Sequence, residues 1–180
     1  MDTQKFLPYA QPSISSEDIE YVCRSLATSI ITRGPFVEAF ENAIASYCGA
    51  RYGVAFTNAT AALMAAYRVT DIGPADQIIT TPNSFIASVG PGIQQKATPV
   101  FLDIDRNTGN IDLTKLEINM DRRASRGKTV VVPVHFAGIP VDMQTVDKLI
   151  KNPETIVIED AAHALGSCYS DGTKVGSCAW

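Results

Sequence analysis

Short runs of apolar, largely β-branched residues alternate with segments of helical periodicity over most of the chain. The most continuous run is KTVVVPV at residues 128–134, and four other runs share its character, namely YGVAFT (52–57), QIITT (77–81), TPVFLDI (98–104) and TIVI (155–158). Strands with nearly all-apolar residues are typical of a parallel sheet that is covered on both faces. The sequence therefore predicts an α/β fold of three layers, with a mainly parallel sheet flanked by helices.

The segments between and before these runs predict helices. Ser15 and Asp18 have the spacing of a capping box, which predicts a helix over about 16–28. Apolar residues from Phe36 to Tyr47 predict a second helix that Gly49 ends. Helical periodicity predicts four more helices, at 60–69, 84–94, 112–118 and 141–151.

Composition excludes several classes of protein. The net charge is −4, and the basic residues are mostly scattered, so the sequence gives no reason to expect a nucleic-acid partner. The first residues lack the basic and apolar regions of a signal peptide, and no apolar run approaches the length of a membrane span. The four cysteines have no metal-type spacing and favour reduced thiols. We therefore expect a cytoplasmic protein with no metal site and no membrane contact.

Three of the predicted strands end in residues that could bind a ligand, because ligands of parallel sheets gather at the carboxyl ends of the strands. Asn58, Ala59 and Thr60 open a helix of small residues, whose N-terminal N–H groups could hold a phosphate. An ordinary Asn or Thr helix cap is the competing interpretation. Phe85 follows the next strand and could stack on a planar heterocycle, although an aromatic residue on its own is more often part of the core.

Asp160 is the most informative of these residues, because a charge at the end of a buried strand is costly unless it is compensated. A protonated ring nitrogen of a cofactor would compensate it, and His163 could donate a hydrogen bond to the same ligand. The alternative for Asp160 is a helix N-cap, and for His163 a structural histidine. A phosphate site, a stacking ring and an acid for a pyridinium together indicate pyridoxal 5'-phosphate.

The order and spacing of several motifs resemble those of the DegT/DnrJ/StrS-type sugar-nucleotide aminotransferases of fold type I. The resemblance spans essentially the whole chain and rests on PYAQPSISSEDI, TRGPFVEAFENAIASYCGA, TNATAAL, TTPNSFIAS, TPVFLDID with GNID, and EDAAHALGS with KVGS. Within the family, the ATAAL, SF and HALGS variants are most similar to the transaminase subgroup of pseudaminic acid biosynthesis, which makes UDP-4-amino-4,6-dideoxy-N-acetyl-β-L-altrosamine. The resemblance implies residues 1–34 as an N-terminal segment with one helix, and 35–180 as the N-terminal part of the large domain.

The resemblance also implies a role for each matching residue. Ala59 and Thr60 would bind the phosphate of pyridoxal 5'-phosphate, Phe85 would stack on its ring and Asp160 would pair with the ring nitrogen. His163 would lie near the 3-hydroxyl of the ring. Four residues match segments near the sugar-nucleotide site of the family, Tyr9, Thr32, Arg33 and Gly34.

The Schiff-base lysine of the family is expected beyond residue 180, about a dozen residues after the VGS motif. Lys174 precedes that motif, where the family also has a polar turn, so we expect a surface lysine there. The chain therefore looks like an N-terminal fragment that is inactive alone, of an enzyme that moves an amino group from L-glutamate to a UDP-linked 4-keto-6-deoxy sugar. The resemblance implies a homodimer, or a fragment that associates with itself.

Three alternatives stay open. One is a sugar dehydratase of the same family, in which a histidine replaces the lysine at a position that also lies beyond residue 180. Another is a non-catalytic binding or regulatory module with the same fold. A dinucleotide-binding domain is disfavoured, because no GxGxxG motif follows any predicted strand.

Overall fold

The computed structural model describes residues 6, 8, 10–121 and 127–177. The chain divides into two compact units, Met1–Phe40 and Glu41–Trp180, and each is described by itself. The division that we expect after residue 34 stays a prediction. Tyr9 lies outside the described residues.

The first unit contains α1 (Ser16–Leu26) and the beginning of α2 (Pro35–Cys48). The predicted capping box is confirmed at α1, where the Ser15 hydroxyl accepts a bond from the backbone N–H of Asp18. The Asp18 carboxylate in turn accepts a bond from the N–H of Ser15. Gly49, at φ +77°, follows the last residue of α2, as the sequence predicts.

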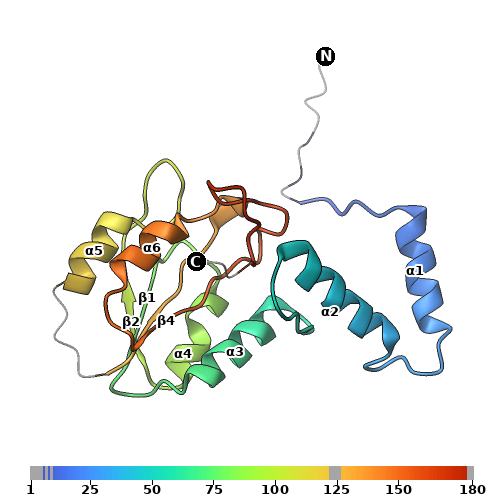
Figure 1. Cartoon of the computed structure of the whole chain (residues 1–180), viewed down its shortest axis with the longest axis horizontal. Helices are drawn as coiled ribbons and strands as arrows, with labels where there is room; N and C mark the ends of the chain where they lie inside the picture. Colours follow the sequence, from blue (N-terminus) through green and yellow to red (C-terminus); the bar gives the residue numbers. More distant parts are fainter. Residues whose placement is uncertain (1–5, 7, 9, 122–126, 178–180) are drawn as a thin grey trace, which may run out of the picture. The chain divides into compact units, whose positions relative to one another are not determined.

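The second unit is built on a sheet of four parallel strands, which lies among the helices of this unit in Figure 1. They are β1 (Gln77–Thr80), β2 (Thr98–Phe101), β3 (Thr129–Val131) and β4 (Thr155–Val157), in the order β2-β1-β3-β4. All three pairings are parallel, so the carboxyl ends of the four strands lie at one edge of the sheet. The predicted parallel sheet is confirmed.

Helices cover both faces of this sheet (Figure 1). On one face, Ile78 and Val130 belong to a cluster of buried residues, to which α3 (Ala59–Thr70) contributes Tyr67. Two short helices contact α3, namely η1 (Ile86–Ser88) and α4 (Gly90–Gln94). Ile79 and Val131 face the second cluster, together with residues of α5 (Leu113–Asp121) and α6 (Met143–Leu149). Because neighbouring residues of a strand point to opposite faces, an all-apolar strand supplies both clusters at once. The predicted three-layer α/β class is confirmed.

Two predicted elements differ in the structure. Residues 52–57, predicted as a strand, do not form one. A strand needs a hydrogen-bonded neighbour, and none of the described segments pairs with these residues. The backbone N–H of Ala55 donates instead to Glu41 Oε1 at 2.8 Å. The helix expected over 84–94 divides into η1 and α4. The division follows from Pro91, which lies in the first turn of α4, where its missing N–H costs nothing.

Candidate functional site

Asp160 lies just beyond β4, at the edge of the sheet where the strands end. The backbone holds it there: its N–H donates to the carbonyl oxygen of Pro133 at 2.9 Å, and its own carbonyl accepts from the N–H of His135 at 3.0 Å. These bonds extend the pairing of β3 with β4 as an isolated parallel bridge. The residue is 8% exposed, so its carboxylate is largely removed from water.

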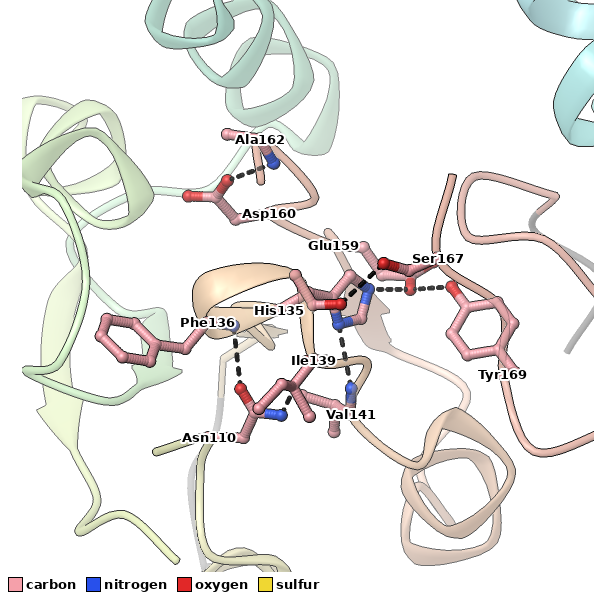
Figure 2. Close-up of polar contacts among 11 residues, drawn as sticks. Asn110, His135, Phe136, Ile139, Val141, Glu159, Asp160, Ala162, Ser167 and Tyr169 are labelled. Carbon is pink, nitrogen blue, oxygen red and sulfur yellow. Dashed lines mark hydrogen bonds and ion pairs between the residues drawn. The ribbon is translucent and has the colours of Figure 1, made fainter. Parts of the chain in front are cut away.

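The Asp160 carboxylate receives two hydrogen bonds from neutral donors. The Ser88 hydroxyl donates to Oδ2 at 2.5 Å, and the backbone N–H of Ala162 donates to Oδ1 at 3.2 Å, the second of which Figure 2 shows. Among the described residues, no Lys, Arg or His nitrogen lies within 4.0 Å of this carboxylate. Residues 161–167 form turns, so the alternative that Asp160 caps a helix is wrong.

The beginning of α3 presents backbone donors. Asn58 is its N-cap, and the Asn58 side chain accepts a hydrogen bond from the N–H of Ala61 at 2.9 Å. The N–H groups of Ala59 and Thr60 have no partner among the described residues. The ordinary cap that competed with a phosphate site is therefore present, and it leaves two donors of the first turn open.

A cavity of about 230 Å³ connects these two features. It is lined by one side of α3 and by the chain after β4, and its lining includes Ala59, Ala62, Glu159, Asp160 and Ala162. Two predicted cofactor residues, Ala59 and Asp160, are thus brought to one cavity although 101 positions of the sequence (160 − 59) separate them.

The other predicted cofactor residues do not line this cavity. Thr60 is the residue after Ala59 in the first turn of α3. Phe85 directly precedes η1 and is 70% exposed, so the alternative that it belongs to the core is wrong. His163 is exposed on the turn after Asp160, so the alternative of a buried structural histidine does not describe it.

Glu159 points away from Asp160, into a second polar network that the sequence analysis missed (Figure 2). Its Oε2 lies 2.7 Å from His135 Nε2 and accepts a hydrogen bond from the Tyr169 hydroxyl at 2.5 Å. His135 Nδ1 accepts from the N–H of Val141 at 3.0 Å, which places the imidazole proton on Nε2, where it faces the carboxylate. The two acidic residues after β4 therefore take part in separate hydrogen-bond networks, Asp160 with Ser88 on one face of the sheet and Glu159 with His135 and Tyr169 on the other.

Ser88 and Tyr67 are further residues that the sequence analysis did not single out. Both are 0% exposed, and the Tyr67 hydroxyl donates to the backbone oxygen of Ser88 at 2.7 Å. Burial raises the pKa of Tyr67 above its usual value, and the negative charge of Asp160 raises it further. The only available signal was the position of Ser88 in the SFIAS stretch, since nothing in the sequence links it to Asp160.

Lys174 packs against an aromatic ring of α2. Its ammonium lies 3.8 Å from the centre of the Tyr47 ring, and its pKa is raised, chiefly by its interaction with the Tyr47 side chain. We expect a surface lysine at this position; Lys174 is half-buried and packs on the Tyr47 ring, and its lack of a catalytic role stays a prediction.

Three predicted substrate residues, Thr32, Arg33 and Gly34, belong to the first unit, and their role stays a prediction. Gly34 is buried, and a Cβ atom there would lie 2.2 Å from the backbone oxygen of Ile30, so this position requires glycine. Arg33 is exposed at φ +53°.

None of the described helices combines the length and apolar character that crossing a membrane requires. Within the same residues, no three His, Cys, Asp or Glu side chains are grouped so that they could hold a metal ion.

Comparison with known proteins places these features in context. The sequence profile described as the DegT/DnrJ/EryC1/StrS aminotransferase family matches residues 12–179. The chain is 42% identical over 164 residues to the spore coat polysaccharide biosynthesis protein SpsC of Bacillus subtilis, which covers 91% of this chain and 41% of that protein.

Solved structures share the fold. Helicobacter pylori PseC, an aminotransferase involved in the biosynthesis of pseudaminic acid, aligns with a TM-score of 0.85 at 35% identity, over 95% of this chain and 45% of that one. A GDP-4-keto-6-deoxymannose-3-dehydratase aligns with a TM-score of 0.82 over 91% of this chain and 43% of that one; at 22% identity this match shows the fold alone. The chain spans less than half the length of each of these relatives.

Proposed function

The chain belongs to the DegT/DnrJ/EryC1/StrS aminotransferase family, and from this premise we propose that it forms part of a sugar-nucleotide aminotransferase. The proposed reaction moves an amino group from L-glutamate to a UDP-linked 4-keto-6-deoxy sugar. The names of PseC and SpsC support a role in pseudaminic acid or polysaccharide biosynthesis. A cytoplasmic homodimer is part of the same proposal.

The observation that carries the proposal is the shared cavity of α3 and the end of β4. Its lining joins Ala59, whose open N–H can bind a phosphate, to Asp160, whose buried carboxylate has no cationic partner among the described residues. Pyridoxal 5'-phosphate carries a phosphate at one side of its ring and a basic nitrogen in the ring, so the residues present fit it. When bound, this group would hold the amino group in transfer and accept the electrons released at the substrate carbon.

Each site residue has a proposed part in this arrangement. The N–H groups of Ala59 and Thr60, with the positive end of α3, would hold the phosphate. The Asp160 carboxylate would pair with the protonated ring nitrogen, and the exposed ring of Phe85 would stack on the cofactor. His163 would donate a hydrogen bond near the 3-hydroxyl.

The residues that we propose to bind the substrate all belong to the first unit. Tyr9, Thr32, Arg33 and Gly34 would contact the sugar nucleotide. Arg33 is the residue suited to the diphosphate, because a guanidinium can form two parallel hydrogen bonds with phosphate oxygens.

The 180-residue chain is proposed to bind the cofactor without turnover, because the Schiff-base lysine of the family is expected beyond residue 180. The dehydratase alternative differs at that same position, where it has a histidine. An assay of the full-length protein with L-glutamate and a UDP-4-keto-6-deoxy sugar would separate the two functions, since only the aminotransferase gives an amino sugar. A non-catalytic module would give neither product.

Titration with pyridoxal 5'-phosphate, followed by absorbance and by thermal unfolding, tests the cofactor site. Saturating cofactor, at a hundred times its dissociation constant, should raise the free energy of unfolding by about 2.7 kcal/mol. Asp160→Asn should weaken binding by about tenfold to a hundredfold, because it removes a buried carboxylate that faces a cation. Asp142→Asn is the matched control: Asp142 caps α6, lies outside the cavity lining, and its replacement still caps a helix.

Two results would contradict the proposal. One is a wild-type chain that shows no specific cofactor binding. The other is a stoichiometric adduct on Lys174 after borohydride reduction, since that lysine would then be the nucleophile.

A further inference from the structure

Ser88 gives Asp160 its shortest hydrogen bond, across 72 positions of the sequence. Its hydroxyl donates to Asp160 Oδ2 at 2.5 Å, and the Ser88 side chain is fully buried. A hydrogen bond to a carboxylate in a buried site is shorter and stronger than one between neutral groups. The bond therefore constrains the direction in which the carboxylate points.

Ser88 is itself held in place by α3 and η1. The buried Tyr67 of α3 donates its hydroxyl hydrogen bond to the backbone oxygen of Ser88 at 2.7 Å, and the N–H of Ser88 donates to the backbone oxygen of Phe85 at 3.0 Å. The helix that presents the open N–H groups of Ala59 and Thr60 thus also fixes the donor to Asp160.

A hydroxyl orients a carboxylate without cancelling its charge. The two donors to Asp160, Ser88 and Ala162, are neutral, and none of the cationic side chains among the described residues lies within 4.0 Å of it. Each carboxylate oxygen accepts more than one hydrogen bond, so Oδ2 keeps acceptor capacity beside its bond to Ser88. The remaining attraction is available for a cation that enters the cavity.

We propose that Ser88 is a positioning residue, whose hydroxyl aims the Asp160 carboxylate at the protonated ring nitrogen of the bound cofactor. This inference rests on the proposed function and extends it to a residue that does not touch the cofactor. A purely structural Ser88, which only joins η1 to the sheet, is the competing explanation. The two explanations differ in one respect: replacing a positioning residue changes the affinity only for ligands that carry the ring nitrogen.

The test compares two ligands on each variant. One is pyridoxal 5'-phosphate, and the other is its 1-deaza analogue, in which a carbon replaces the ring nitrogen. Ser88→Ala should weaken binding of the natural cofactor about tenfold and leave binding of the analogue within about twofold. Ser88→Thr keeps a hydroxyl and should restore most of the lost affinity. The ratio of the two affinities is insensitive to partial unfolding of a variant, because unfolding lowers both equally.

Thr70→Val is a matched control for the loss of a buried hydroxyl. Thr70 is 8% exposed, and its hydroxyl donates to the backbone oxygen of Tyr67 at 2.7 Å, so its removal perturbs α3 without touching Asp160. The control should leave the affinity ratio unchanged.

The possible outcomes separate the inference from the proposed function. If the wild-type chain binds both ligands equally or binds neither, the assignment of Asp160 to the ring nitrogen fails. If the wild-type chain prefers the natural cofactor but Ser88→Ala keeps the same preference, the proposed function stands and the positioning role of Ser88 is refuted.

Discussion

Replacing His135 with alanine tests whether the buried network on Glu159 stabilises the end of the sheet. The His135 side chain is 0% exposed, and its Nε2 lies 2.7 Å from an oxygen of Glu159, whose side chain is 8% exposed. Its Nδ1 accepts a hydrogen bond from the buried backbone N–H of Val141 at 3.0 Å. The His135→Ala variant removes both bonds and leaves a buried space in the segment that follows β3.

The cost follows from the kind of bond that is lost. A hydrogen bond to a charged group contributes about 1.5 to 3 kcal/mol, and a buried N–H left without its acceptor costs about 1 to 3 kcal/mol. We therefore expect His135→Ala to lower the free energy of unfolding by about 3 to 5 kcal/mol, because the variant loses the bond to the carboxylate and leaves the Val141 N–H without its acceptor. Tyr169→Phe keeps the ring and removes a single bond to the same oxygen, so its expected cost is about 1.5 kcal/mol.

Urea unfolding followed by far-ultraviolet circular dichroism measures these differences. Lys151→Ala is the control, because it breaks an ion pair with Asp121 at 3.3 Å in which both side chains are mostly exposed, and it should change the free energy of unfolding by less than about 0.5 kcal/mol. If His135→Ala cost no more than Tyr169→Phe, the two bonds of the imidazole together would stabilise the fold no more than the single bond of Tyr169 does. The interpretation of this network would then be wrong.

Two further predictions concern the core around α3. The raised pKa of Tyr67 means that its phenol ionises more readily in the unfolded chain, so its contribution to stability is complete below pH 10 and decreases as the pH rises above 10. Above pH 10, the urea midpoint should therefore fall less steeply with pH in Tyr67→Phe than in the wild type. Tyr52→Phe, which changes an exposed tyrosine, is the control and should follow the wild type. Gly92→Ala would place a Cβ atom 2.2 Å from the side chain of the buried Ile78, so we expect thermal unfolding to show a free energy of unfolding lower by about 1 to 3 kcal/mol. In the control Gly73→Ala, the new Cβ atom meets no atom within 4 Å, so the decrease should be smaller. Equal decreases would show that contact with Ile78 is not the cause.

Local patterns in the sequence predict most elements of the fold. The capping box of Ser15 and Asp18 and the glycine at position 49 mark helix ends, because the groups that satisfy a helix end lie within a few residues of it. The all-apolar strands predict a sheet covered on both faces, since alternate residues must be buried on both sides. The error at residues 52–57 has the opposite cause: apolar residues favour a strand, but a strand also needs a neighbour, which no local pattern encodes.

The sequence by itself determined the α/β class, the parallel sheet and the candidate residues that follow the predicted strands, because these follow from spacings of a few residues. The tertiary structure decided which of those residues meet. It joined Ala59 to Asp160 in one cavity, and it supplied the Ser88 hydroxyl to a carboxylate 72 positions away. It also directed Glu159 to His135 on the other face. The physical reason is that hydrogen bonds and burial act over a few ångströms, and only the packing of α3 and η1 with the sheet brings such distant residues within that range.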